Sequence, residues 1–179
     1  MRLIWKVDQS LGGCHSEITQ RGPDATVLEI YVDADACPVK SEVYRVAERH
    51  GLRVHIVAHQ AMRVPDRDWI AATILPEAPD AADDWIAEHI QADDICITSD
   101  VPLVDRCLKC GARVIGPKGR VFTESSIGDV LATRNLLTHL RDAGQITGGP
   151  APFAEKDRSR FLNVLHETIV AIKRAAKRD

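Results

Sequence analysis

The sequence predicts an α/β domain with a Rossmann-like parallel sheet sandwiched by helices. Between residues 27 and 115, short β-rich runs alternate with stretches in which apolar residues recur every three or four positions. The β-rich runs are almost entirely apolar, as expected for strands that are covered on both faces. The chain has 179 residues, of which 45% are hydrophobic and 4% aromatic. A chain of this length can bury a core without disulfides or structural metals.

The first strand is expected within residues 27–33, VLEIYVD, which is followed by Pro38, a residue that suits the first turn of a helix. The next helix carries apolar residues on one side, namely Val39, Val43, Val46 and Ala47. Gly51 is placed to end this helix in a left-handed conformation. Together these features predict a strand, a turn and a helix in succession.

The same strand and helix alternation continues to residue 115. Further strands are expected at residues 52–58, 70–75, 95–98 and 113–115. Helices are expected at residues 81–90 and 100–110, the second opened by Asp100 and closed by Gly111. The segment GPKGRVFTESS at 116–126 is predicted to be a loop.

The two ends of the chain have different patterns. Residues 1–26 show no sustained period and contain a Gly-Gly pair and Pro23, so they are predicted to form an extension outside the core. Beyond residue 126 the pattern is purely helical, with helices expected at 127–144 and 154–177 around a hinge, TGGPAPF. We therefore expect an extension, 1–26, and one domain, 27–179, that includes a C-terminal helical pair, 126–179.

Composition and charge limit the classes of function. The 23 basic and 26 acidic side chains give a net charge of −3, which argues against bulk attraction to nucleic acid but leaves room for a local basic patch. No apolar run is long enough for a membrane span or a signal peptide. The odd number of cysteines, five, favours a reducing compartment, so we expect a cytoplasmic protein. No GxGxxG motif follows the first strand, which argues against a dinucleotide cofactor.

Acidic residues follow several of the predicted strands. Asp33 and Asp35 end the first strand, Asp80 and Asp83 begin the helix after the third, and Asp100 follows the fourth. Ligands of open parallel sheets bind outside the carboxyl ends of the strands. If the first and fourth strands are neighbours, Asp33 and Asp100 approach each other and Asp83 can reach the same point.

Carboxylates gathered in this way repel one another, by roughly 4 kcal/mol per pair at about 4 Å and an effective dielectric near 20. A compensating cation is then required, and oxygen ligands favour Mg²⁺ or Mn²⁺. Such an ion commonly supports phosphate chemistry, so the pattern predicts metal-assisted phosphodiester hydrolysis. The alternative is structural: Asp35 and Asp100 could be helix N-caps, and Asp80 and Asp83 could be first-turn acids.

Six segments carry a family resemblance. They are VDADACPVK (32–40), DAAD (80–83), ITSDVPL (97–103), GPKGRVFT (116–123), RNLLTHLRDAG (134–144) and TGGPAPFAEKDRSRF (147–161). In this order they resemble the YaiI/YqxD family, uncharacterised bacterial protein family 0178, which is similar to the PIN-like nuclease superfamily. The resemblance implies a PIN-like fold, RNA as a partner, and Asp33, Asp83 and Asp100 as catalytic metal ligands, with Asp35 and Asp80 adjacent.

Two other functions stay open. DADAC after an apolar strand also resembles the first motif of haloacid-dehalogenase-type phosphatases, in which Asp33 would attack phosphorus and Thr98 and Lys118 would serve later motifs. Many PIN nucleases have a fourth acid after Asp100, and this chain has no clear one. A binding module that retains the acidic pocket without hydrolysis is therefore the third hypothesis.

Basic residues near the predicted acidic edge are candidates for contacts with substrate phosphates. The set consists of Lys40, Lys118, Arg120 and Arg134. The planar guanidinium of arginine suits this role because it binds phosphate at two points. Salt bridges between the C-terminal helices and the α/β body are the structural alternative.

Overall fold

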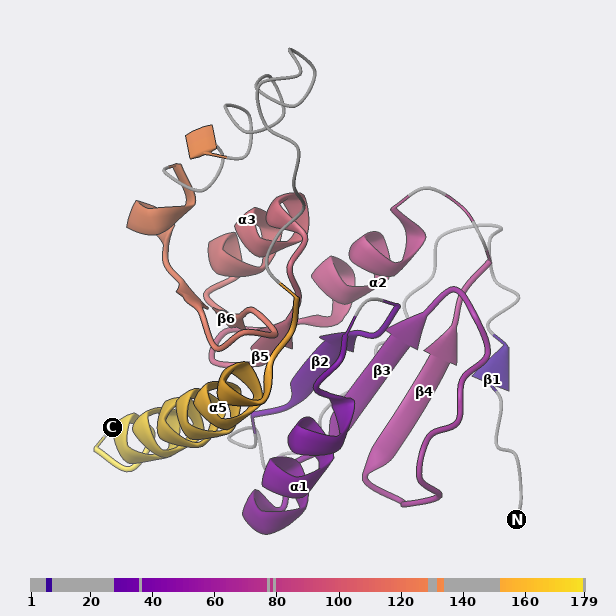
Figure 1. The fold of residues 1–179 in the computed structure, drawn as a ribbon, viewed down its shortest axis with the longest axis horizontal. Helices are drawn as coiled ribbons and strands as arrows, with labels where there is room; N and C mark the ends of the chain where they lie inside the picture. The colour runs from indigo at the N-terminus through magenta and orange to yellow at the C-terminus, as the bar shows by residue number, and fades with distance from the viewer. Residues whose placement is uncertain are drawn as a thin grey trace.

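The structure is a computed structural model that describes residues 6–7, 28–35, 37–76, 78, 80–128, 132–133 and 152–178. Its centre is a seven-stranded sheet with the order β1-β4-β3-β2-β5-β6-β7 (Figure 1). The strands are β1 (Lys6–Val7), β2 (Ile30–Asp33), β3 (Val54–Ala58), β4 (Ile70–Ile74), β5 (Ile95–Ile97), β6 (Arg113–Ile115) and β7 (Val121–Phe122). All neighbouring pairs are parallel except β6 and β7.

Helices cover both faces of the sheet, which confirms the predicted α/β class. They are α1 (Lys40–His50), α2 (Ala81–His89), α3 (Val101–Lys109) and α5 (Glu155–Ala175), and residues 124–128 are also helical. Alternate strand residues face opposite sides. Ile30 and Val32 belong to the core under α1 and α5, whereas Tyr31 belongs to the core under α2 and α3 (Figure 1).

The strand order creates a switch point between β2 and β5. From β2 the chain crosses through α1 to β3 on one side, and from β5 it crosses through α3 to β6 on the other. The predicted adjacency of these two strands is confirmed by the register, in which Ile30 lies opposite Ile95 and Val32 opposite Ile97. The crevice at such a point is where ligands of open α/β sheets bind.

Helix α1 follows the predicted pattern, with a different start. Val43, Val46 and Ala47 are buried on its inner side, and Gly51 ends it with a φ of 65°, as predicted. The helix begins at Lys40, with Val39 in the N-cap position, so Pro38 precedes the first turn. The prediction that Pro38 lies in the first turn is therefore wrong by two positions.

Strands β1 and β7 were not predicted, because each contains only two residues. Lys6 and Val7 lie in the stretch expected to remain outside the core, yet they pair with Thr73 and Ile74 at the edge of the sheet. In the segment predicted to be a loop, Val121 pairs with Ile115 in an antiparallel bridge. The sheet is thus mostly parallel, with one antiparallel strand.

The long C-terminal helix packs beside α1, as expected for part of the domain. Its buried residues are Phe161, Leu165, Ile169 and Ile172. Polar contacts fix the pairing: the Arg158 guanidinium lies 2.6 Å from the carboxylate of buried Glu42, and His50 Nε2 lies 2.9 Å from His166 Nδ1. Most of the other predicted C-terminal helix, 127–144, and residues 147–151 of the predicted hinge lie outside the described residues.

Among the helices of the described residues, none has the length and apolar character required to cross a membrane.

Candidate active site

Asp33 and Asp100 lie at the carboxyl ends of the neighbouring strands β2 and β5, and the hydroxyl of Thr98 contacts both residues. The Thr98 side chain donates a 2.9 Å hydrogen bond to Asp33 Oδ2 and accepts one of 3.0 Å from the backbone N–H of Asp100. Thr98 is itself buried. The hydroxyl therefore orients one carboxylate and fixes the backbone of the residue that carries the other.

Asp100 also caps α3, as the structural alternative proposed. Its Oδ2 accepts a 3.2 Å hydrogen bond from the backbone N–H of Leu103. A capping carboxylate is held in one orientation at a helix start. The capping role and the place beside Asp33 therefore occur together, and neither excludes the other.

Asp83 belongs to the same electrostatic cluster. Burial, followed by the charges of Asp100, Asp33 and Asp80, raises the pKa of Asp83 to about 6, while Arg106 opposes the shift. Asp83 lies in the first turn of α2, and the arrowheads of β2 and β3 point toward the side of the sheet where this helix lies (Figure 1). The structure thus brings together acids that are separated by 50 and 17 positions in the chain.

The pKa of Asp33 responds in the same direction. Burial raises it above its ordinary value, the Thr98 hydrogen bond lowers it, and the charges of Asp35 and Asp100 raise it further. The charge of His59 partly offsets these effects. The net rise in the pKa of Asp33 therefore comes chiefly from burial, and the charges of the neighbouring acids add to it.

Asp35 and Asp80 take positions at the margin of the cluster. Both oxygens of Asp35 accept hydrogen bonds from the backbone N–H of His59, at 3.1 and 3.2 Å, and the His59 Nε2 lies 3.9 Å away. Asp35 therefore anchors the loop after β3, and the alternative that it caps α1 is wrong. Asp80 precedes α2 with a φ of 58° and makes no capping hydrogen bond.

The carboxylate oxygens at this edge are of the type that a hard divalent cation prefers. The acids Asp33, Asp83 and Asp100 offer only oxygen atoms as ligands. The pKa values of the first two are raised by burial first and by repulsion between the acids second, and a cation would relieve the repulsion. In the described part of the chain, however, no three His, Cys, Asp or Glu side chains converge as a metal-ligand group.

The predicted phosphate contacts have different surroundings. Lys40 Nζ donates a 2.9 Å hydrogen bond to the carbonyl of Ala34, so it stabilises the turn that follows Asp33. Lys118 is half-buried, and Arg120 is exposed with its guanidinium 5.3 Å from the Phe122 ring centroid. Arg134 lies outside the described residues.

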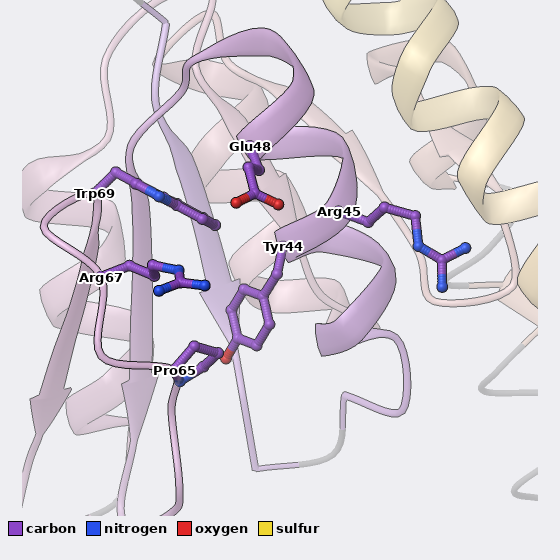
Figure 2. A pocket seen from close by; sticks show the side chains of 6 residues that line it. All are labelled: Tyr44, Arg45, Glu48, Pro65, Arg67 and Trp69. Atoms are coloured by element: carbon purple, nitrogen blue, oxygen red, sulfur yellow. The ribbon is translucent and has the colours of Figure 1, made fainter. Parts of the chain in front are cut away.

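A separate hollow lies on the α1 face and contains none of the predicted site residues. It has a volume of about 290 Å³ and is lined by Tyr44, Arg45, Glu48, Pro65, Arg67 and Trp69. Figure 2 shows the Tyr44 ring directed toward Pro65 and the Arg45 side chain pointing away. The Tyr44 hydroxyl is buried, has no hydrogen-bond partner among the described residues, and has a pKa raised to about 12, chiefly by burial. Because none of the acids at the strand ends lines this hollow, the acidic edge remains the better candidate for chemistry.

Sequence reasoning missed the roles of Thr98 and His59. A hydroxyl at the end of an apolar strand, two residues before an acid, is the signal that could have identified Thr98. His59 lies directly after β3, and its Nδ1 is 3.0 Å from the carbonyl of Pro76. Its contact with Asp35 depends on the pairing of β2 with β3, which a local pattern does not contain.

Comparison with known proteins gives consistent matches. Residues 31–171 match a family described as uncharacterised and bacterial, YaiI/YqxD. The chain is 55% identical over 148 residues to a UPF0178 protein of Azorhizobium caulinodans, covering 83% of this chain and 93% of that one. It is 57% identical over 148 residues to one of Rhodospirillum rubrum, covering 82% and 99%. No solved structure matches. The family match and these identities over most of each protein establish that the chain belongs to the uncharacterised YaiI/YqxD family, UPF0178.

Proposed function

We propose that this protein is a Mg²⁺- or Mn²⁺-dependent phosphodiester hydrolase that acts on RNA. The observation that carries the proposal is the placement of Asp33 and Asp100 at the ends of the neighbouring strands β2 and β5, where their charges also act on Asp83. Shifted carboxylates in a crevice of this kind are typical of functional sites. The PIN-like resemblance of the family supports the same reaction class.

Asp33, Asp83 and Asp100 would hold the metal, with Asp35 and Asp80 adding negative charge nearby. When bound, a divalent ion of this kind supplies an activated water and stabilises the charge that develops on a phosphodiester. The chain itself contributes position: Thr98 holds Asp33, and the α3 cap holds Asp100. Lys118 and Arg120 are suited to hold substrate phosphates, whereas Lys40 supports the turn.

Calorimetric titration with Mn²⁺ tests the metal site. We expect Asp100→Asn and Asp83→Asn each to weaken Mn²⁺ binding at least tenfold, because each removes a charged oxygen ligand. Asp105→Asn is the matched control, since Asp105 lies on α3 but pairs with Lys109 at 2.6 Å on the surface. Equal affinity in all four proteins would show that the site is assigned incorrectly.

Cleavage of a mixed RNA pool tests the reaction. We expect Mn²⁺-dependent cleavage by the wild type and its loss in Asp100→Asn. RNA that stays intact with metal bound would favour the binding module. A phosphoryl group trapped covalently on Asp33 would favour a phosphatase.

A further inference from the structure

We infer that the loop at residues 116–120 and the start of α5 form one phosphate-binding surface beside the acidic edge, and that Arg160 is part of it. The three cations concerned are Lys118, Arg120 and Arg160, which we call the loop–helix cations. This inference deepens the proposed function, because it names the chemistry that holds the substrate next to the carboxylates. The ligand class is a single-stranded polyanion with a phosphodiester backbone.

The loop begins at the acidic edge. The backbone N–H of Thr98 donates a 3.3 Å hydrogen bond to the carbonyl of Ile115, the residue before the loop. The side chain of the same threonine binds Asp33. Because β6 and β2 flank β5, the loop starts about 10 Å from Asp33, the width of two strand spacings.

Two hydrogen bonds fix the shape of the loop. The N–H of Gly119 donates to the carbonyl of Gly116 at 2.9 Å, and the N–H of Gly116 donates to the carbonyl of Arg120 at 2.7 Å. Gly119 has a φ of 73°, which a residue with a Cβ rarely adopts. The loop is therefore a fixed turn that holds Lys118 and Arg120 on either side of Gly119.

The same glycine brings α5 to the loop. A Cβ at position 119 would lie 2.9 Å from Arg160 Cγ, 3.0 Å from the Arg160 carbonyl carbon and 3.0 Å from the Phe161 nitrogen. Phe161 is fully buried, which fixes this part of the helix. Arg160 thus stands against the loop, although it is 40 positions further along the chain.

Charge explains why a substrate needs these cations. The acidic edge carries several carboxylates, which repel every phosphate except those that a bound metal neutralises. Arg160 and Arg120 are exposed, so their guanidinium groups are accessible to a ligand. Arg158, two residues earlier and therefore on nearly the opposite side of the helix, instead pairs with the buried carboxylate of Glu42. Of these two arginines near the start of α5, Arg160 is therefore the one that a ligand on the loop side can reach.

Equilibrium binding of a fluorescent single-stranded RNA tests the inference. All proteins carry Asp100→Asn to prevent cleavage, and anisotropy is measured between 50 and 300 mM NaCl. The test variant adds Lys118→Gln, Arg120→Gln and Arg160→Gln. The matched control adds Arg174→Gln, Lys177→Gln and Arg178→Gln, which remove the same charge from exposed positions at the far end of α5. Thermal melts verify that each variant is folded.

We expect the test variant to lose at least tenfold in affinity at 100 mM salt, and its log–log salt slope to fall in magnitude by about 2, since each contact with single-stranded phosphate contributes about 0.7. The control should remain within twofold. Equal losses in both variants, no loss in either, or no RNA binding by the parent would overturn the inference.

The outcome separates this inference from the proposed hydrolysis. Suppose that the loop–helix cations bind RNA but protein with Asp100 intact does not cleave it. This result would contradict the hydrolase and still support the phosphate-binding surface. The opposite result is metal-dependent cleavage by a variant that keeps Asp100 and carries only the three loop–helix substitutions, with kcat/KM unchanged. It would support the hydrolase and defeat the phosphate-binding surface.

Discussion

The hydroxyl of Thr98 connects two of the proposed metal ligands through one oxygen atom. It donates to Asp33 Oδ2 and accepts from the N–H of Asp100, and it lies in a buried position where lost hydrogen bonds are costly. A valine has nearly the same shape but can make neither bond. The residue is therefore a point at which the order of the acidic edge can be tested without changing any charge.

Thr98→Val is expected to lower the free energy of unfolding by about 1 to 3 kcal/mol, because it removes one hydrogen bond from the half-buried backbone N–H of Asp100 and one from the carboxylate of Asp33. It should also raise the pKa of Asp33 further, since the hydrogen bond from Thr98 lowers it. Urea unfolding and an NMR titration of the carboxyl carbons measure the two effects. Thr168→Val is the control, because the Thr168 hydroxyl donates only to the carbonyl of Val164 in its own helix. An unchanged Asp33 titration would contradict the role given to Thr98.

The raised pKa of Asp83 predicts how stability depends on pH. In the unfolded chain this carboxyl titrates near 3.8, and in the folded protein at about 6. Between these values the folded state binds more protons, so the free energy of unfolding should fall as pH rises from 4 to 6. The effect should be about 1 kcal/mol, because solvent screens a half-buried group.

Asp83→Asn should flatten this part of the pH profile and be more stable than the wild type at pH 8. Urea unfolding of both proteins in EDTA between pH 4 and pH 8 measures the free energy of unfolding at each pH. Parallel profiles for the two proteins would contradict the raised pKa of Asp83.

At the scale of elements, the pairing of α1 with α5 depends on a buried charge. Burial raises the pKa of Glu42, but its hydrogen bond and ion pair with Arg158 outweigh this, and the net pKa is below the ordinary value. The carboxylate side chain is 3% exposed, and that of Arg158 is 40% exposed. The position of α5 therefore depends on the ion pair between Arg158 and Glu42, in which the Glu42 carboxylate is shielded from water.

Arg158→Gln is expected to destabilise the protein by about 2 kcal/mol at pH 7, because it leaves the Glu42 charge buried without its partner. The double variant with Glu42→Gln should recover part of this loss. Because the pKa of Glu42 is lowered in the folded protein, the ion pair contributes its full stability above the unfolded pKa of 4.5. This contribution to stability declines as pH falls through the folded pKa. Urea unfolding of wild type and Arg158→Gln at pH 7 and pH 3.5 should thus show a smaller difference at the lower pH. A difference that is independent of pH would rule out the charge of Glu42 as its cause.

The sequence was informative for elements with a full apolar period and uninformative for short ones. The buried faces of α1 and α3 repeat every three or four residues, so their positions could be predicted. Strands β1 and β7 contain two residues each, too few to show alternation. The acids at the strand ends could be predicted because topology alone places them at one edge. The positions of Thr98, His59 and Arg160 could not, because each depends on contacts between segments distant in the chain.

At the scale of the molecule, a single sheet supplies both cores. Successive residues of β2, such as Tyr31 and Val32, face opposite hydrophobic clusters. Unfolding of this strand would therefore disrupt the packing on both faces of the sheet. Trp69 packs against the α1 and α5 side, and Trp85 against the α2 and α3 side. The two indoles therefore report separately on the two layers.

We expect both layers to unfold in one cooperative transition. Trp5→Phe combined with Trp85→Phe leaves Trp69 as the reporter, and Trp5→Phe combined with Trp69→Phe leaves Trp85. Each variant's urea midpoint by fluorescence should coincide with its midpoint by far-UV circular dichroism. A fluorescence midpoint displaced from the circular dichroism midpoint in either variant would indicate that one layer unfolds independently.

The two-residue strand β7 also affects how copies of the protein meet in solution. A long exposed strand edge is a template for association between molecules, and natural sheets limit this risk with short margins. Here β7 runs antiparallel to β6, and the chain turns into a helical segment at residue 124. Val121, the large apolar side chain exposed on this strand, is 47% accessible. Such a margin offers a neighbouring copy little backbone for intermolecular pairing, so aggregation through β7 should be disfavoured at the concentrations that calorimetry and NMR require.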